Sequence, residues 1–118
     1  MLAEPRHDPG QCVTAREYPL SGTAVVTAGV VADDPNGSIE AQTKSVLDKI
    51  DGFLADAGTD KHHLTHVYVW LSSIADFAAM NTVYDAWVSA DQKPGRACVE
   101  TRLADPRLKV EIQVFAVK

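Results

Sequence analysis

The sequence lacks any run of lysine and arginine and any long stretch of apolar residues. Its 11 basic residues are outnumbered by 16 acidic ones, which gives a net charge of -5 at pH 7. Nucleic-acid binding needs clustered Lys and Arg on the phosphates, so this balance argues against DNA or RNA as the main partner. No segment reaches the roughly 18 consecutive apolar residues of a membrane-spanning helix, which argues against a bilayer-embedded protein.

Cysteine is also scarce. Cys12 and Cys98 are the two cysteines, and they form no CxxC pair, so we expect reduced thiols in a cytoplasmic protein. Residues 1–10 have no apolar core of the kind found in signal peptides, and we expect a poorly ordered lead-in there. With 118 residues, of which 46% are hydrophobic and 23% charged, residues 1–118 are expected to form a single domain.

The rest of the sequence alternates between strand-like and helix-like segments. Ala24–Val31 and Leu64–Leu71 are apolar on both faces, as expected of buried strands. Residues 11–20 are ambiguous between an edge strand and a loop. Between the two apolar runs, Ser38 is suited to be the N-cap of a helix and Gly58 to follow its end. Ser73 resembles the start of a capping box for a second helix.

The two expected helices each carry one apolar stripe. The side chains assigned to these stripes are Ile39, Val46, Ile50, Phe53, Leu54 and Ala57 in the first helix, and Phe77, Met80, Tyr84, Trp87 and Val88 in the second. The Met and aromatic residues of the second stripe are interpreted as core. Strands and helices in this order predict an α+β protein with a layer of helices on a sheet.

The segment Pro94–Val117 is interpreted as two strands joined by a turn at Ala104–Pro106. Glu111 lies within the apolar second strand, and a buried carboxylate without a partner is costly. Arg96, at the start of the first strand, could supply that partner. A guanidinium and a carboxylate close together can hold a small anion and activate a water beside it. A structural salt bridge between neighbouring strands is an equally open interpretation.

The number of apolar strands exceeds what two helices can cover. Two amphipathic helices cover one face of a sheet, yet at least three runs are apolar on both faces. Proteins rarely leave large apolar patches exposed, so another copy of the same chain is the expected cover. The sequence therefore predicts a closed homo-oligomer.

Other candidate site residues have more ordinary interpretations. His62, His63 and His66 form an HHxxH pattern, but they lack Cys or carboxylate ligands at suitable spacing, so we assign them no metal. Cys98 shares a strand face with Arg96 and could be a nucleophile, although no orienting His or Asp is evident. Asn81 on the second helix is typical of a helix-face hydrogen bonder.

Three segments together resemble the reactive intermediate deaminase family, also called the Rid, YjgF or L-PSP endoribonuclease family. They are IEAQTKSVLDKID in the first helix, DFAAMNTVYDAW in the second and PGRACVETRLADPRLKVEIQVFA at the end. The second segment is most similar to a branch beside classical RidA. The resemblance implies a chorismate mutase-like mixed sheet with two helices on one face. It also implies a homotrimer whose sheets form a central barrel, with sites between subunits.

The resemblance also implies a site chemistry. Arg96 would clamp the carboxylate of a 2-imino acid, the backbone N–H of Cys98 would meet the same ligand, and Glu111 would position the attacking water. Gly29 and Asn81 are expected among the substrate-binding residues. The implied activity is that of a 2-iminobutanoate/2-iminopropanoate deaminase, a hydrolase that needs neither cofactor nor metal.

The chain departs from the family pattern around the expected site. Gly95 and Ala97 flank Arg96 where Ala and Ser or Thr are usual, and Ala28 stands where many members carry Ser. Tyr18 is about three residues out of register with a tyrosine that lines the family's site. A non-enzymatic trimer that binds small carboxylates or proteins is therefore a second hypothesis. An endoribonuclease, the third, is disfavoured by the acidic balance.

Overall fold

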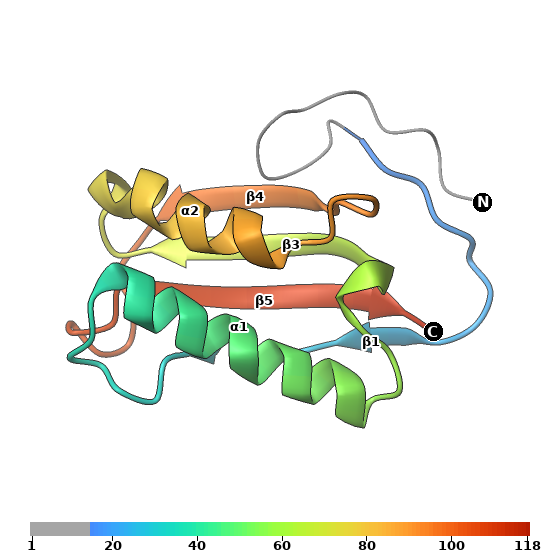
Figure 1. Ribbon diagram of the computed structural model, residues 1–118, viewed down its shortest axis with the longest axis horizontal. Helices are drawn as coiled ribbons and strands as arrows, with labels where there is room; N and C mark the ends of the chain where they lie inside the picture. Colours follow the sequence, from blue (N-terminus) through green and yellow to red (C-terminus); the bar gives the residue numbers. More distant parts are fainter. Residues whose placement is uncertain (1–14) are drawn as a thin grey trace.

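A computed structural model describes residues 15–118 as a sheet with helices on one face (Figure 1). The expected lead-in at residues 1–10 and Cys12 lie outside the described residues. The elements in chain order are β1 (Ala24–Val26), β2 (Val30–Val31), α1 (Ile39–Asp56), β3 (Leu64–Leu71), α2 (Phe77–Trp87), β4 (Gly95–Glu100) and β5 (Val110–Val117), with short 3-10 turns at Lys61–His63 and Ile74–Asp76. The expected α+β class is confirmed.

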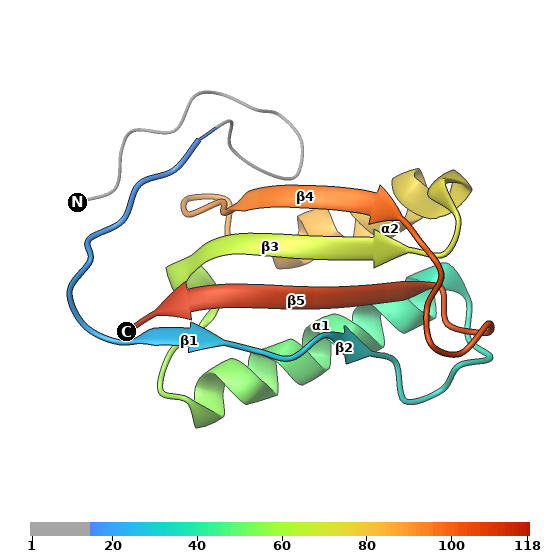
Figure 2. The same cartoon turned by 180° about the vertical axis from the view of Figure 1, so that it is seen from behind.

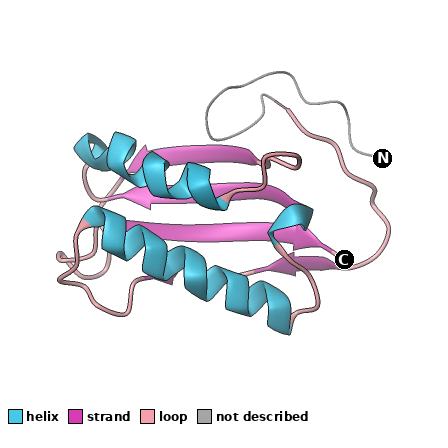
Figure 3. Cartoon of the chain, in the orientation of Figure 1, coloured by secondary structure: helices cyan, strands magenta, loops and turns pink. Residues whose placement is uncertain are grey.

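The sheet is mixed, with strand order β1-β5-β3-β4 and β2 also paired with β5. Strand β5 runs antiparallel to β1, β2 and β3, whereas β3 and β4 are parallel and joined by α2. Both helices lie on the same face of the sheet (Figure 3). In the view from behind, the strands lie in front and the helices behind them (Figure 2). Within residues 15–118, no helix has the length and apolar character to cross a membrane.

The prediction that β4 and β5 are neighbouring strands is wrong. A turn does connect them, with Leu108 N donating to Asp105 O at 3.0 Å. However, β3 lies between the two strands and pairs with both. The β3–α2–β4 segment is a crossover unit, which places two parallel strands side by side, and β5 then occupies the remaining edge of β3.

The single strand expected at Ala24–Val31 is broken into β1 and β2. Thr27, in the gap, donates its N–H to Val114 O at 3.1 Å, and its hydroxyl accepts from Val114 N at 3.2 Å. The Thr27 carbonyl accepts from the Gln113 side chain at 2.8 Å. These contacts replace the regular ladder over residues 27–29, and they put Gly29 in an irregular stretch beside β5. The ambiguous stretch has neither helix nor strand over its described residues, 15–20.

Helix α1 begins and ends where the sequence predicts. The Ser38 hydroxyl accepts from Ala41 N at 3.1 Å, and Gly58 follows the helix with φ of +84°, a conformation that favours glycine. Gln42, which the apolar pattern missed, is 1% exposed and accepts from Lys109 N at 2.8 Å. This bond ties the start of α1 to the start of β5.

The core lies between the helices and the sheet, as the stripes predict, with three corrections. Phe53 is 46% exposed and Phe77 39% exposed. The apolar stripe of a helix shows which side of the helix faces the core, but not whether every residue on that side is covered. Ser73 caps the 3-10 turn before α2, accepting from Ala75 N at 3.3 Å, and so does not cap α2 itself. The α2 residues Met80 and Tyr84 are fully buried, as expected of core.

The helix-free face of the sheet is rich in apolar and aromatic side chains. Val26 is 58% exposed, Val99 51% and Tyr68 39%. The ring of His66 stacks on Phe115 with centroids 3.9 Å apart on this same face. We call this surface, which also carries Trp70, the open face; patches of this kind mark interaction sites.

Candidate functional site

Arg96 lies on β4, an edge strand of the described sheet, with its side chain on the helix-covered face. Its register partner on β3 is Val67, which is fully buried. The guanidinium carbon lies 4.7 Å from the ring centroid of Tyr84 and 5.8 Å from that of Phe77, and Nη1 is 3.8 Å from Met80 Sδ. None of the ion pairs within residues 15–118 includes Arg96. Its N–H donors therefore have capacity for an external anion.

Cys98 offers a backbone donor rather than a nucleophile. Thr101 N donates to Leu71 O at 2.8 Å, so Thr101 bonds toward β3. Only every second residue of a strand bonds to a given neighbour, so the N–H of Cys98, three residues earlier, points to the outer edge of β4. Burial raises the pKa of the Cys98 thiol, and the nearby Arg96 charge only partly opposes this. A raised pKa disfavours the thiolate that a nucleophile needs.

Asn81 follows Met80, the α2 residue that Arg96 contacts. Its side chain is buried, at 6% exposure, and Oδ1 has no hydrogen-bond partner among the described residues. Buried amide groups are nearly always paired, so this unpaired oxygen is an exception among the described residues. Arg96 and Cys98, whose thiol senses the Arg96 charge, form what we call the arginine cluster.

Glu111 projects from the opposite face of the sheet. Its register partners are Trp70 on β3 and Val31 on β2. Trp70 lies between Val69 and Leu71, which are buried under the helices, so Trp70 and Glu111 share the open face. A Cβ at Gly29 would lie 2.0 Å from Glu111 Oε2, so the carboxylate fits only because residue 29 has no side chain. None of the ion pairs of residues 15–118 includes Glu111. We call Glu111 and Gly29 the glutamate cluster.

The structure does not bring Arg96 and Glu111 together within one chain. They lie on opposite faces, and β3 separates their strands, which puts β4 and β5 about 10 Å apart. The salt bridge between neighbouring strands considered from the sequence is therefore wrong for the single chain. The arginine cluster holds a cation, and the glutamate cluster a carboxylate, that belong to none of the ion pairs of residues 15–118.

The departures from the family pattern leave both clusters in place. A Cβ at Gly95 would meet nothing within 4 Å, so the usual alanine would fit there. Ala97 pairs in register with Tyr68 and is exposed on the open face. Ala28 is exposed beside Gly29. No structural contact explains the loss of a hydroxyl at either alanine.

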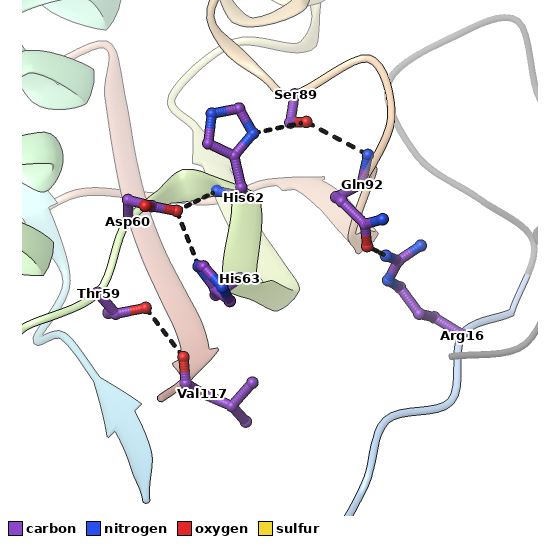
Figure 4. A network of polar contacts seen from close by, with 8 residues as sticks. All are labelled: Arg16, Thr59, Asp60, His62, His63, Ser89, Gln92 and Val117. Atoms are coloured by element: carbon purple, nitrogen blue, oxygen red, sulfur yellow. Dashed lines mark hydrogen bonds and ion pairs between the residues drawn. The ribbon is translucent and has the colours of Figure 1, made fainter. Parts of the chain in front are cut away.

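The histidines of the HHxxH pattern have local partners (Figure 4). His62 Nδ1 lies 3.0 Å from Ser89 Oγ, and His63 Nδ1 lies 2.8 Å from Asp60 Oδ1. The hydrogen bond with His63 holds the pKa of Asp60 below its usual value. Among residues 15–118, no three His, Cys, Asp or Glu side chains come together in a way that could hold a metal ion.

A hollow of about 440 Å³ lies beside these histidines. Its walls are Tyr18, Pro19, His62, His63, Leu64, Thr65, Gln92 and Val117. Neither the arginine cluster nor the glutamate cluster contributes to this lining. Tyr18 therefore lines a hollow to which neither cluster contributes.

Comparisons with known proteins bear on the family and the fold. The model of the family described as Endoribonuclease L-PSP matches residues 14–118. The chain belongs to the endoribonuclease L-PSP family. A RutC family protein of Haemophilus ducreyi is 42% identical to this L-PSP family chain over 89 residues, covering 75% of it and 76% of the relative.

Solved structures of L-PSP family relatives share the fold. A YjgF family member from Neisseria meningitidis is 36% identical with a TM-score of 0.79, covering 100% of this chain and 95% of the other. A Rid family protein from Yersinia pestis is 26% identical with a TM-score of 0.80, covering 92% and 87%. These names confirm the family inferred from the sequence, and the matches confirm a mixed sheet with two helices on one face.

Proposed function

We propose that this L-PSP family protein hydrolyses reactive 2-imino acids and their enamine tautomers to 2-oxo acids and ammonia. The observation that carries the proposal is that Arg96 and Glu111 both lack an ion-pair partner among the described residues. A small substrate with a carboxylate at one end and an imine at the other would use both charges. The chemistry needs no cofactor because the imine carbon is already electrophilic.

The proposal includes an assembly. The two clusters lie on opposite faces of the sheet, so one substrate can meet both only between subunits. The apolar open face supports such an assembly, since covering it would bury Val26, Tyr68 and Val99. Together with the family resemblance, this favours a homotrimer in which each site combines the arginine cluster of one subunit with the glutamate cluster of the next.

In the proposed reaction, Arg96 binds the substrate carboxylate through paired charge-assisted hydrogen bonds, and the Cys98 N–H donates another. Glu111 of the neighbouring subunit takes a proton from water while the water oxygen attacks the imine carbon. The proton passes to the nitrogen, the C–N bond breaks and a carbonyl forms. One water is consumed and one ammonia released, with no change of oxidation state. Positioning the water and the imine supplies most of the rate gain.

Turnover of 2-imino acids, generated in place by an amino-acid oxidase, tests the function. We expect Arg96→Lys to lose about 2–4 kcal/mol in kcat/KM although it keeps the charge, because Lys lacks the paired donors. Glu111→Gln should lower kcat more than it raises KM. Melting temperatures should stay close to that of the wild type for both variants. A fully active Arg96→Lys protein would falsify the carboxylate clamp.

A non-enzymatic, carboxylate-binding trimer is the second candidate, favoured by the missing hydroxyls at Ala28 and Ala97. It predicts that 2-oxobutanoate binds in calorimetry and that 2-imino acids are released unchanged. The endoribonuclease activity in the family's description is disfavoured by the net charge of -5. Incubation with labelled RNA under the same conditions checks it, with no cleavage expected.

A further inference from the structure

The guanidinium of Arg96 packs against two aromatic rings and a methionine of α2. The guanidinium carbon lies 4.7 Å from the centroid of Tyr84 and 5.8 Å from that of Phe77. Between them, Met80 Sδ lies 3.8 Å from Nη1. Residues 77, 80 and 84 are three and four positions apart, so they project from one stripe of the helix. A single helix face therefore sets where the cation lies.

This mode of support has a chemical consequence. A cation over an aromatic ring is attracted by the ring's negative face. The five N–H donors of a guanidinium lie in its plane, so contact with a ring leaves them free to point elsewhere. A carboxylate partner in the chain would instead occupy those donors. Arg96 forms none of the ion pairs described for residues 15–118, so although Nη1 donates to Met80 Sδ, no carboxylate of these residues occupies its other donors.

We propose that Tyr84 is a positioning residue, whose buried ring holds the guanidinium of Arg96 so that its N–H donors are aimed at a ligand carboxylate. The inference rests on the carboxylate-binding role proposed above for Arg96. Tyr84 is fully buried, so its ring has a fixed place in the core. Phe77 is 39% exposed and farther from the cation, and it makes a smaller contribution.

A purely structural Tyr84 predicts a different outcome. In that case, replacing the ring would lower stability without changing how the folded protein binds carboxylates. Trp87 supplies the matched control because it belongs to the same helix and is also buried, at 9% exposure. Its indole bonds to Asp51 and lies under Lys61, and its ring packs against Tyr84 with centroids 5.8 Å apart, but none of these contacts involves Arg96.

The test compares Tyr84→Leu, Tyr84→Phe and Trp87→Leu by calorimetry with 2-oxobutanoate, a stable carboxylate of the product class. We expect Tyr84→Leu to bind roughly 3- to 30-fold more weakly, the range that corresponds to loss of a cation–π contact. Tyr84→Phe keeps a ring and should bind within about twofold of the wild type. Trp87→Leu should lose thermal stability but retain affinity. Wild-type affinity in folded Tyr84→Leu overturns the inference.

A spectroscopic reading separates this inference from the proposed function. Ring currents from Tyr84 should move the Nε–Hε resonance of Arg96 upfield of exposed arginines, with Arg96→Lys giving the assignment. That shift should persist in Tyr84→Phe. A resonance in the exposed range in the wild-type protein overturns the inference, even if Tyr84→Leu does not fold. A shifted resonance in a protein that neither binds carboxylates nor turns over imines supports the positioning of Arg96 and refutes the function.

Discussion

The carboxylate of Glu111 occupies the space that a side chain at Gly29 would need. A Cβ at residue 29 would lie 2.0 Å from Glu111 Oε2 and 2.9 Å from Cδ. No positive φ is involved at this glycine, so its role is steric. The absent side chain lets the carboxylate lie close to the sheet, and Gly29 thereby determines where the proposed base is held.

Gly29→Ala should displace this carboxylate and impair catalysis. The clash falls on the end of a flexible side chain, so we expect Glu111 to rotate away and the melting temperature to change little. A misplaced catalytic group can cost roughly 100-fold in rate, and we expect a loss approaching that in kcat. Gly95→Ala is the control, because its Cβ would meet nothing within 4 Å and activity should persist. Full activity in Gly29→Ala would contradict the assignment of Glu111.

Subunits that carry different defects should restore each other. We expect Arg96→Ala and Glu111→Gln proteins to be inactive when refolded alone. Refolded together in equal amounts, they should recover roughly a quarter of the wild-type activity, because one site in four would combine an intact Arg96 with an intact Glu111 from a neighbour. Mixing Arg96→Ala with the double variant should restore nothing. Absence of recovery in the first mixture would place both residues in one subunit's site or in none.

A charge on the open face should break the assembly. Tyr68→Glu places a carboxylate where the neighbouring subunit is expected to pack, and an unpaired buried charge costs several kcal/mol. We expect light scattering to find trimers for the wild type and smaller species for Tyr68→Glu at micromolar concentration. Phe53→Glu changes an aromatic on α1, away from the open face, that is 46% exposed against 39% for Tyr68, and it should remain trimeric. A monomeric wild-type protein would refute the assembly altogether.

Stability should fall as the solution is acidified, through His66. Burial lowers the pKa of His66, and its ring faces Tyr68, Phe115 and the Thr65 hydroxyl, with no carboxylate among these contacts. The unfolded state, with a His pKa near 6.5, then takes up a proton first, so lower pH favours unfolding until the folded-state pKa is also passed.

The measurement for His66 is the melting temperature between about pH 7.5 and pH 5, compared with His66→Phe, which keeps the stacked ring but cannot titrate. The wild type should lose more melting temperature than the variant over this range. Asp105, whose pKa Arg107 lowers to about 2, titrates well below it and does not interfere. If the melting temperatures of the two proteins fall equally with pH, His66 does not control the loss of stability.

The sequence predicted local structure well where the signal is local. Leu64–Leu71 is a strand with the predicted bounds, and the Ser38 cap and Gly58 stop bound α1. The break at Thr27 could not be predicted, because it depends on bonds to Val114 and Gln113, which are distant in sequence. Phe53 was wrongly assigned to the core for a similar reason. The position of a residue around a helix does not show whether another element packs against that part of the helix.

The sequence singled out a set of candidate site residues but not their arrangement. Arg96 and Glu111 could be singled out because isolated charges in apolar strands need an explanation. Their separation follows from strand order, which the short connection between β4 and β5 concealed. The missed signal was the strand–helix–strand pattern of β3, α2 and β4, since such crossovers join parallel neighbours. Once β3 separates the two strands, residue alternation sets the opposite faces.

The position of β5 also bears on how the chain folds during its synthesis. β5 follows every other described strand in the sequence, yet it pairs with β1, β2 and β3 and holds the centre of the sheet. Until a ribosome has made Val110–Val117, the strands before it cannot close into one sheet, and their apolar faces have no neighbour. A nascent chain therefore stays exposed to aggregation until β5 has been synthesised and completes the core cooperatively.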